Sequence, residues 1–351
     1  MKILVTGGAG YIGGAVSGIL TARGHRPVVF DNLCHGRRDL LPAGVEFVQG
    51  ELADRSHIER LFSAAIESGE PFDGVLHLAA LIEAGESMKR PELYFRNNTA
   101  ATLSLLEAII SQGPRRLVFS STAAVYGEPE SVPIKEDAKL SPTNAYGESK
   151  LLVERMLAWF HRVHGLQFAA LRYFNVAGAP ESENGTVTSG EAHEPESHLI
   201  PLVLDVALGR RSSIRVYGMD YPTPDGTCVR DYIHVSDLAE AHLLALHQLS
   251  KMQGSSLQSE RYLGNNAYNL GNGAGFSVLQ VIDSVRRVTG HPIPVEICPR
   301  REGDPAVLVA SSERAVRELG WRPKYTDLDD IVRTAWAWHQ KRYLAAGDRN
   351  R

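Results

Sequence analysis

The chain has 351 residues, of which 43% are hydrophobic and 22% charged, and its formal net charge at pH 7 is -4. These proportions are ordinary for a folded protein and exclude a fibrous or disordered chain. The charge balance offers no basic field for nucleic acid or an anionic membrane, and no apolar run reaches the ~20 residues of a membrane span. With three widely spaced cysteines, these properties favour a cytoplasmic protein with free thiols, no nucleic-acid partner and no membrane association.

In the first half of the chain, short runs rich in Val, Ile, Leu and Phe alternate with longer stretches of helical pattern. Six of these runs are predicted strands: Ile3–Thr6, Val28–Asp31, Val45–Gln49, Val75–Ala79, Leu117–Ser121 and Phe168–Tyr173. Buried strands that alternate with helices are typical of a parallel sheet covered on both faces. The sequence therefore predicts an α/β fold with a doubly wound, Rossmann-type sheet in a first domain of residues 1–175.

The second half, residues 176–351, begins with a long polar loop over residues 180–198 and an apolar helix near Leu199. Further on, the pattern predicts helices at 277–290 and 327–343, a strand at 295–297 and a short helix at 312–319. These elements indicate a smaller α/β domain for the substrate, and residues around 230–250 could belong to either domain. The Ser-rich stretch 251–266 is predicted to be a surface insertion without chemistry.

Glycines follow the first predicted strand at a G-x-x-G-x-x-G spacing, as Gly7, Gly10 and Gly13. The first permits a tight turn, the second lets backbone approach a pyrophosphate, and the third allows close packing of helix on strand. Asp31 ends the second strand, where a carboxylate binds the adenosine 2′-hydroxyl and repels a 2′-phosphate. The pattern predicts NAD as the cofactor. The arginine pair at 37–38 could reverse the preference for NAD over NADP. We expect these two arginines to lie in a solvated loop instead.

Tyr146 and Lys150 lie four residues apart and therefore on one face of a predicted helix. A phenol acts as a base near neutral pH only where positive charge stabilises the phenolate, and Lys150 beside an oxidised nicotinamide would supply it. Thr122 follows the fifth strand, at the carboxyl edge of the sheet where such folds bind ligands. We expect Tyr146 to be the base, Lys150 to support it and Thr122 to share a hydrogen bond with the substrate hydroxyl.

Ordered motifs along essentially the whole chain, including TGGAGYIG, SSTAAVYG, YGESK, LRYFNVAGA, HEPESHLIP and DGTCVRDYIHVSDL, resemble the extended short-chain dehydrogenase/reductase superfamily. Within it, the chain is similar to the UDP-glucose 4-epimerases, which implies reversible 4-epimerisation of a UDP-hexose with tightly bound NAD. The resemblance implies cofactor contacts from Gly7, Gly10, Tyr11, Ile12, Gly13, Asp31, Asn32, Leu52, Ala79, Asn98, Tyr146, Lys150 and Tyr173. It implies substrate contacts from Thr122, Tyr146, Asn175, Leu199, Tyr217, Arg230, Arg301, Asp304 and Val307, with the arginines on phosphate and Asp304 on the uridine ribose.

Members of this superfamily commonly pair through two helices, so a homodimer is expected through the predicted helices at 98–112 and 146–163. Val307 stands where relatives restricted to plain hexoses carry a tyrosine beside the sugar 2-position. Because valine leaves more space, the resemblance predicts room for the 2-acetamido group of UDP-N-acetylglucosamine or UDP-N-acetylgalactosamine.

Rival functions differ in the residues that they require. A 4,6-dehydratase of this fold would carry an Asp-Glu pair where Ala123 and Ala124 stand, which disfavours elimination. A 4-epimerase of a pentose or uronic-acid nucleotide stays open. A non-catalytic NAD sensor is also an alternative, although the complete Thr122, Tyr146 and Lys150 set argues against it.

The stretch 193–198 holds two histidines and two acids and could be mistaken for a metal site. Zinc ligands are usually held by a compact turn or one helix face, whereas a proline interrupts this loop. We therefore expect no metal. His77, at the end of the fourth strand, is expected to be a packed, hydrogen-bonded residue.

Overall fold

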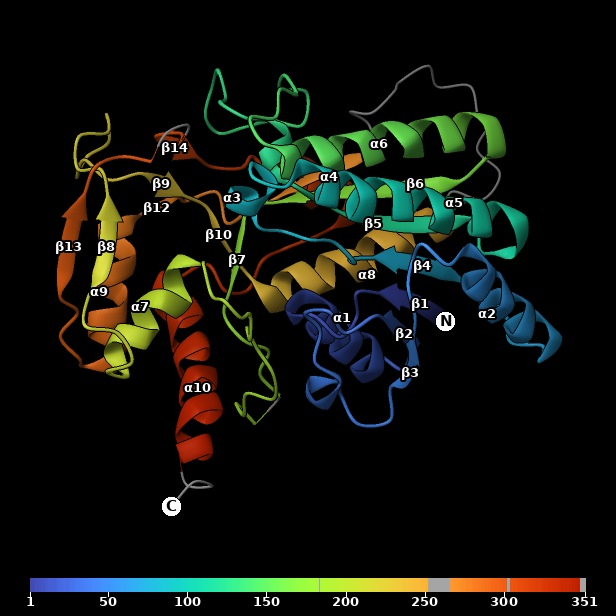
Figure 1. Ribbon diagram of the computed structural model, residues 1–351, viewed down its shortest axis with the longest axis horizontal. Helices are drawn as coiled ribbons and strands as arrows, with labels where there is room; N and C mark the ends of the chain where they lie inside the picture. Colours follow the sequence, from blue (N-terminus) through green and yellow to red (C-terminus); the bar gives the residue numbers. More distant parts are fainter. Residues whose placement is uncertain (183, 252–265, 302–303, 348–351) are drawn as a thin grey trace.

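The computed structural model describes residues 1–182, 184–251, 266–301 and 304–347. Within them, a seven-stranded sheet has the order β11-β6-β5-β4-β1-β2-β3 with parallel pairing throughout (Figure 1). Its strands are β1 Lys2–Thr6, β2 Arg26–Asp31, β3 Glu46–Gln49, β4 Gly74–His77, β5 Arg116–Thr122, β6 Gln167–Tyr173 and β11 Ala267–Leu270. Every strand predicted for the first domain is present, and the doubly wound sheet is confirmed.

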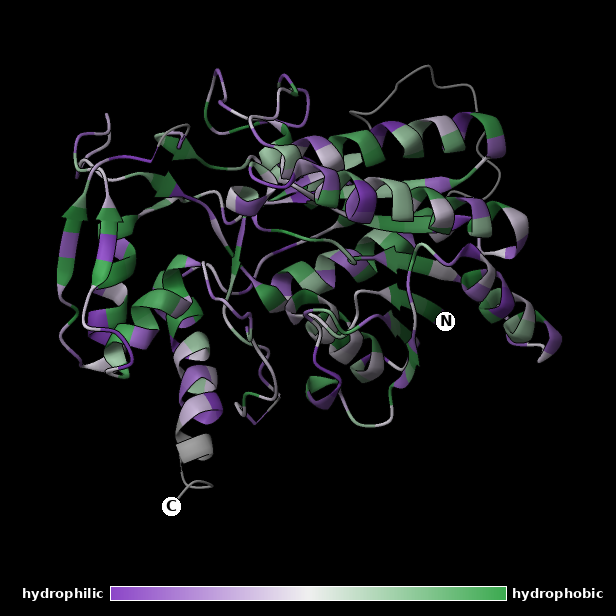
Figure 2. Cartoon of the chain, in the orientation of Figure 1, coloured by the Kyte–Doolittle hydropathy of each residue, from purple (hydrophilic) through white to green (hydrophobic). Residues whose placement is uncertain are grey.

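Helices cover both faces of this sheet: α1 Tyr11–Ala22 and α8 Val235–Lys251 on one, α2 Arg55–Glu67, α5 Ala101–Gln112 and α6 Ala145–His164 on the other. Ile3 and Val5 of β1 belong to the core beneath α1 and α8, whereas Leu4 belongs to the core beneath α2 and α5. Successive side chains of a strand point to opposite faces, so a strand buried on both needs a continuous apolar run. Figure 2 shows these central strands as hydrophobic along their length.

Short helical segments complete the first part of the chain: η1 Arg38–Leu40, α3 Ala84–Ser87, α4 Pro91–Tyr94, the π-helical η2 Phe95–Ala100 and η3 Ala123–Val125. The predicted helix at 98–112 thus comprises part of η2 followed by α5. The helix predicted at 146–163 is α6. No helix in the described part of the chain is both long and apolar enough to cross a membrane.

The second part of the chain packs α7 Leu199–Ala207, α9 Val278–Thr289 and α10 Leu328–Gly347 beside the parallel pair β8 Ile214–Tyr217 and β13 Val295–Cys298. A small sheet joins β12 Phe276–Ser277, β9 Val229–Arg230 and β14 Val307–Leu308, and β7 Asn175–Ala177 pairs with β10 Tyr232–His234. Val203, Ile282 and Val332 belong to a separate hydrophobic core in this part. The predicted helices and strand are present, including a helical segment with η4 Ala315–Leu319.

The chain returns to the large sheet after the second part has begun. α8 packs on α1, β5 and β6, and β11 pairs with β6 through partners such as Tyr268 and Leu171. No strand was expected at 267–270. Of the stretch 251–266, expected to be a surface insertion, residues 252–265 lie outside the described residues. The division of the chain at residue 175 stays a prediction.

Candidate active site

Steric contacts explain the glycines after β1. Gly7 has φ +70°, and a Cβ there would lie 2.5 Å from the amide nitrogen of Ala79. A Cβ on Gly13 would lie 2.2 Å from the carbonyl oxygen of Gly7, so only glycine lets α1 pack this closely on the turn. Gly10 is the N-cap of α1 and makes no side-chain cap hydrogen bond. The first amides of α1 and the positive end of its dipole are therefore available to an anion, which fits the pyrophosphate of a dinucleotide.

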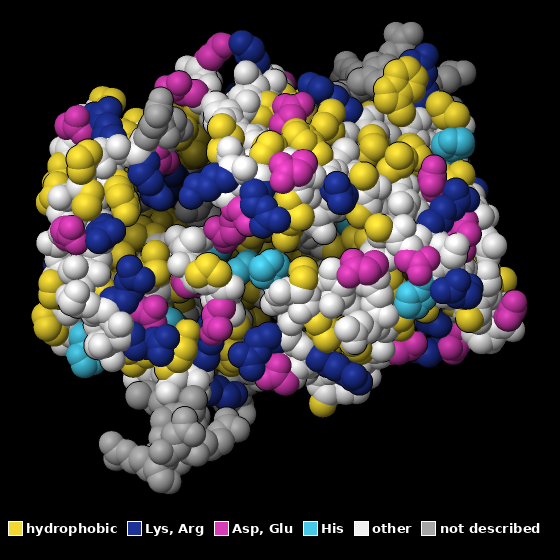
Figure 3. All heavy atoms as spheres, viewed as in Figure 1, with side chains coloured by type: hydrophobic (Ala, Val, Ile, Leu, Met, Phe, Trp, Pro, Cys, Tyr) yellow, Lys and Arg dark blue, Asp and Glu magenta, His cyan; other side chains and the backbone are white. Residues whose placement is uncertain are grey.

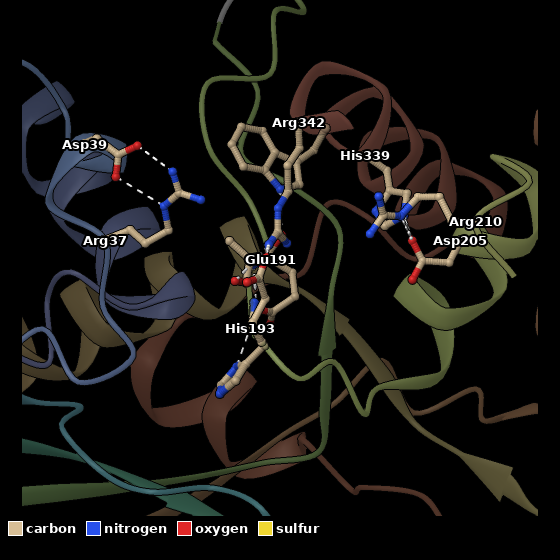
Figure 4. A network of polar contacts seen from close by, with 11 residues as sticks. Arg37, Asp39, Glu191, His193, Asp205, Arg210, His339 and Arg342 are labelled. Carbon is tan, nitrogen blue, oxygen red and sulfur yellow. Dashed lines mark hydrogen bonds and ion pairs between the residues drawn. The ribbon is translucent and has the colours of Figure 1, made fainter. Parts of the chain in front are cut away.

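Asp31 closes β2 beside this turn. One carboxylate oxygen accepts the amide hydrogen of Ala9 at 3.0 Å, and the other accepts that of Leu33 at 2.8 Å. Arg37 pairs with Asp39, N to O at 2.6 Å (Figure 4), and the guanidinium carbon of Arg38 lies 4.9 Å from the ring centre of Phe47. Both arginines thus have other partners, which supports the predicted preference for NAD.

The other predicted cofactor residues lie along the carboxyl ends of the strands. Asn32 follows β2 and donates to Glu51 at 3.1 Å, Leu52 follows β3, and Ala79 follows β4. Tyr11 and Ile12 begin α1, and the Tyr11 hydroxyl donates to the carbonyl of Gly178 at 2.6 Å, which links the turn to the second part of the chain. The fold therefore brings these residues to one edge of the sheet, while their contacts with NAD stay predictions.

Asn98 has a second role that its sequence position did not reveal. It is buried in η2, where its side chain donates to the Leu81 carbonyl at 2.9 Å and to Ser149 Oγ at 3.0 Å. It also accepts the amide hydrogen of Leu81 at 2.8 Å. The side chain ties the loop after β4 to α6, and π-helical turns such as η2 are frequent at functional sites.

The predicted catalytic residues meet at the carboxyl end of β5. Tyr146 and Lys150 are both buried on α6, and the Lys150 ammonium donates to the Ser120 carbonyl at 2.9 Å. Thr122, the last residue of β5, lies close enough to the Tyr146 side chain to oppose the rise in its pKa that burial causes. Asn144 caps α6 by accepting the amide hydrogen of Gly147 at 2.8 Å, which fixes where the helix begins.

Burial dominates the electrostatics of this pair. It raises the pKa of Tyr146 to about 12, with the Thr122 hydrogen bond opposing the shift and the charge of Glu83 adding to it. Burial also lowers the pKa of Lys150 to about 7. Charge is costly in a dry site unless an opposite charge accompanies it. The lowered phenol pKa expected from the sequence therefore depends on positive charge that a bound cofactor would add.

Neighbouring strand-end residues are held by structural contacts. Tyr173 ends β6, where burial is the main cause that raises its pKa. Ser121 donates to Glu154 at 2.6 Å, and the hydroxyl of Ser120 lies 2.8 Å from His242 Nε2. His77 is buried between the hydroxyls of Thr6 and Thr102, at 2.7 Å and 2.8 Å, so its expected packed role is confirmed.

Four of the predicted substrate residues lie close to one another in the second part of the chain. Arg230 of β9 forms an ion pair with one carboxylate oxygen of Asp304, and an Arg301 nitrogen lies 3.5 Å from the other. The Arg301 guanidinium also lies 4.7 Å from the ring centre of Tyr217. Guanidinium groups bind phosphate in bidentate fashion, and Figure 3 shows basic side chains beside a hollow where the two parts of the chain meet.

The remaining substrate candidates are each the first residue of another element of the second part of the chain. Asn175 begins β7, Leu199 begins α7, and Val307 begins β14, where it pairs with Val229 next to Arg230. The pairing of β14 with β9 thus brings Val307 close to Arg230, although the two residues lie far apart in the sequence. Their individual contacts with a substrate stay predictions.

The histidines of the loop before α7 pair with acids. His193 lies 3.6 Å from Glu191, and His198 lies 2.8 Å from Glu196. α10 anchors the loop, because Arg342 donates to the Glu191 carbonyl at 3.3 Å (Figure 4). In the described part of the chain, no group of three or more His, Cys, Asp or Glu side chains is arranged to hold a metal ion.

The strand order, the glycine turn with Asp31 and the buried tyrosine–lysine pair define a dinucleotide-dependent enzyme of the short-chain dehydrogenase type. The model of the NAD dependent epimerase/dehydratase family matches residues 3–271, and the chain belongs to this family.

Within this family, the chain is similar over its whole length to proteins named UDP-glucose 4-epimerase. The chain is 52% identical over 350 residues to a UDP-glucose 4-epimerase of Streptomyces lividans, covering 99% of each. The UDP-glucose 4-epimerase of Brucella ovis in complex with NAD is 41% identical, with a TM-score of 0.87 over 95% of this chain and 97% of that one. The enzyme of Bifidobacterium longum in complex with NAD+ and UDP is 36% identical, with a TM-score of 0.85 over 98% and 99%.

Proposed function

We propose that this protein is an NAD-dependent isomerase that reversibly inverts C4 of a UDP-hexose, interconverting UDP-glucose and UDP-galactose. The observation that carries the proposal is the buried Tyr146–Thr122 pair at the sheet edge that also holds the glycine turn and Asp31. Full-length similarity to UDP-glucose 4-epimerases supports it. When bound, NAD supplies a hydride acceptor that becomes the donor for the return step.

Side chains of the protein carry out proton transfer, stabilise the phenolate and bind the substrate. Tyr146 takes the proton of the C4 hydroxyl and returns it, and Thr122 shares a hydrogen bond with the same hydroxyl. Lys150 lends positive charge to the phenolate. Arg230 and Arg301 hold the diphosphate, so the hexose can present either face to the nicotinamide while its anchor stays fixed. Net inversion without an external reductant requires a transient ketone at C4.

The chain also carries features that disfavour elimination. Ala123 and Ala124 follow Thr122 in η3, where a dehydratase of this fold would need an acid and a base. Neither methyl group can transfer a proton. This observation favours epimerisation over 4,6-dehydration.

Substrate breadth and assembly are further parts of the proposal. The half-buried Val307 beside Arg230 supports acceptance of the N-acetylated hexoses UDP-N-acetylglucosamine and UDP-N-acetylgalactosamine. Exposed hydrophobic side chains on α5 and α6 support a homodimer. Cytoplasmic action agrees with the free cysteines Cys34, Cys228 and Cys298.

The direct test is incubation of the purified chain with UDP-galactose and separation of the products. We expect UDP-glucose to form without added reductant, and denaturation of the protein to release NAD. Protein that contains NAD but converts no UDP-galactose would instead favour an NAD sensor or another nucleotide sugar. Absence of NAD together with undiminished activity would contradict the oxidation mechanism.

A further inference from the structure

Glu83 lies in the loop after β4, where this loop meets the second part of the chain. One carboxylate oxygen, Oε2, accepts a hydrogen bond from Ser197 Oγ at 2.8 Å, just before α7. The Glu83 backbone carbonyl accepts a hydrogen bond from the Tyr94 hydroxyl at 2.7 Å. The Tyr94 ring in turn packs edge-on against the Tyr146 ring, with centroids 6.5 Å apart. Glu83 is therefore bonded both to the neighbour of the catalytic tyrosine and to the segment leading to Leu199.

The other carboxylate oxygen of Glu83, Oε1, is buried and has no hydrogen-bond partner among the described residues. A buried polar atom without a partner is costly, and native proteins keep few of them. A hydroxyl of a bound sugar could satisfy this oxygen, because it can donate a hydrogen bond.

The charge of Glu83 affects the predicted catalytic base, Tyr146. After burial and the Thr122 hydrogen bond, it is the third influence on the pKa of Tyr146, which it raises. The charge of Glu83 also contributes to the raised pKa values of His193 and His198. Each of these histidines, however, is paired with a different acid: His193 with Glu191 and His198 with Glu196. These pairs leave Glu83 as an additional acid, with one unpartnered carboxylate oxygen, between Ser197 and the Tyr94 ring that packs on Tyr146.

We propose that Glu83 is a specificity-determining residue of the sugar pocket, whose Oε1 accepts a hydrogen bond from a sugar hydroxyl and whose charge excludes nucleotide sugars bearing a carboxylate. The inference rests on the proposed function and narrows its substrates to uncharged sugars. A hexuronate has nearly the shape of the hexose, so packing alone discriminates poorly between them. Two like charges brought close together at a binding site do discriminate, because they repel each other.

The test compares the binding of UDP-glucose and UDP-glucuronate to the NAD-loaded full chain by isothermal titration calorimetry. Wild type is expected to bind UDP-glucose at least about tenfold more tightly, a ratio within the range that a like-charge contact produces. Glu83→Gln keeps the shape but removes the charge, so this preference should shrink by about tenfold. Glu86→Gln is the matched control: Glu86 lies three residues further on, in α3, and accepts a hydrogen bond from the same Tyr94 hydroxyl at 3.1 Å. It is also paired with Arg90, and its side chain is 40% exposed. It should keep the wild-type preference.

Titration with UDP, which has no sugar, separates specificity from folding. Glu83→Gln should bind UDP as wild type does, and loss of UDP binding would identify Glu83 as a structural residue and overturn the proposal. Equal preferences in wild type and Glu83→Gln, or the same change in Glu86→Gln, would overturn it as well. Conversion of UDP-galactose by wild type is measured separately, so failure of the epimerase assignment remains distinguishable from failure of the charge argument.

Discussion

Tyr146 and Thr122 face each other at the junction of α6 and β5, and burial keeps the pKa of the phenol high. Tyr146→Phe removes the proton acceptor but leaves Arg230 and Arg301 in place. We expect kcat for UDP-galactose to fall by about 10²- to 10⁴-fold, the usual effect of losing a general base. The Kd for UDP should change little. Steady-state kinetics and calorimetry measure the two quantities, and near-normal turnover would show that another group takes the proton.

A second prediction for a single residue concerns Val307 and the size of the sugar substituent that the site accepts. Its β14 pairs with β9 beside Arg230, so a larger side chain there should reduce the space next to the diphosphate site. Val307→Tyr is expected to lower kcat/KM for UDP-N-acetylgalactosamine by at least about tenfold, since packed interiors penalise overlap strongly. The value for UDP-galactose should change much less. If the wild type is inert toward the acetylated sugar, or if the mutant is equally active on it, Val307 does not control access of the 2-acetamido group.

At the scale of elements, two adjacent glycines of α1 provide a matched comparison. A Cβ on Gly13 would lie 2.2 Å from the Gly7 carbonyl oxygen, whereas one on Gly14 would meet nothing within 4 Å. Gly13→Ala should displace α1 from the turn and lower the amount of NAD that copurifies. Gly14→Ala should retain NAD and stabilise the protein by about 1 kcal/mol, the helix preference of alanine over glycine.

The NAD content of purified protein and its denaturant unfolding curve measure both effects. Equal NAD content in the two variants would refute the claim that the close contact between helix and turn forms the cofactor site. The comparison is informative because both variants add one methyl group to neighbouring positions of the same helix.

For the whole molecule, the exposed outer surface of α5 and α6 bears on assembly. Leu103 is 38% exposed, Trp159 59% and Val163 64%, and Figure 3 shows hydrophobic side chains gathered where Figure 1 places these helices. Large exposed apolar patches mark interaction surfaces. Trp159→Glu should therefore convert a dimer into a monomer in sedimentation velocity at micromolar concentration.

The control for assembly is Val316→Glu. Val316 is 43% exposed on η4, which packs with α8 on the opposite face of the sheet, so its substitution should leave the dimer intact. A wild type that sediments as a monomer at micromolar concentration would refute the dimer proposal.

Local patterns in the sequence are enough to predict the parallel sheet, the glycine turn and the residues proposed for catalysis. β-branched runs, glycine spacing and the Tyr146–Lys150 interval act over a few residues, and short-range backbone and packing preferences suffice to predict them. β11 was missed, because a four-residue strand carries little local signal and gains its stability from pairing with β6. The resemblance identified Asn98, but not its bonds to Leu81 and Ser149.

Which charged side chains come into contact became clear from the folded structure alone. It placed Arg230 and Arg301 beside Asp304 and the Tyr217 ring against Arg301, and it left one oxygen of Glu83 buried without a hydrogen-bond partner among the described residues. Burial in this structure also raises the pKa of Tyr146. Burial and electrostatic interaction depend on neighbours brought together by folding, and sequence spacing carries no record of them.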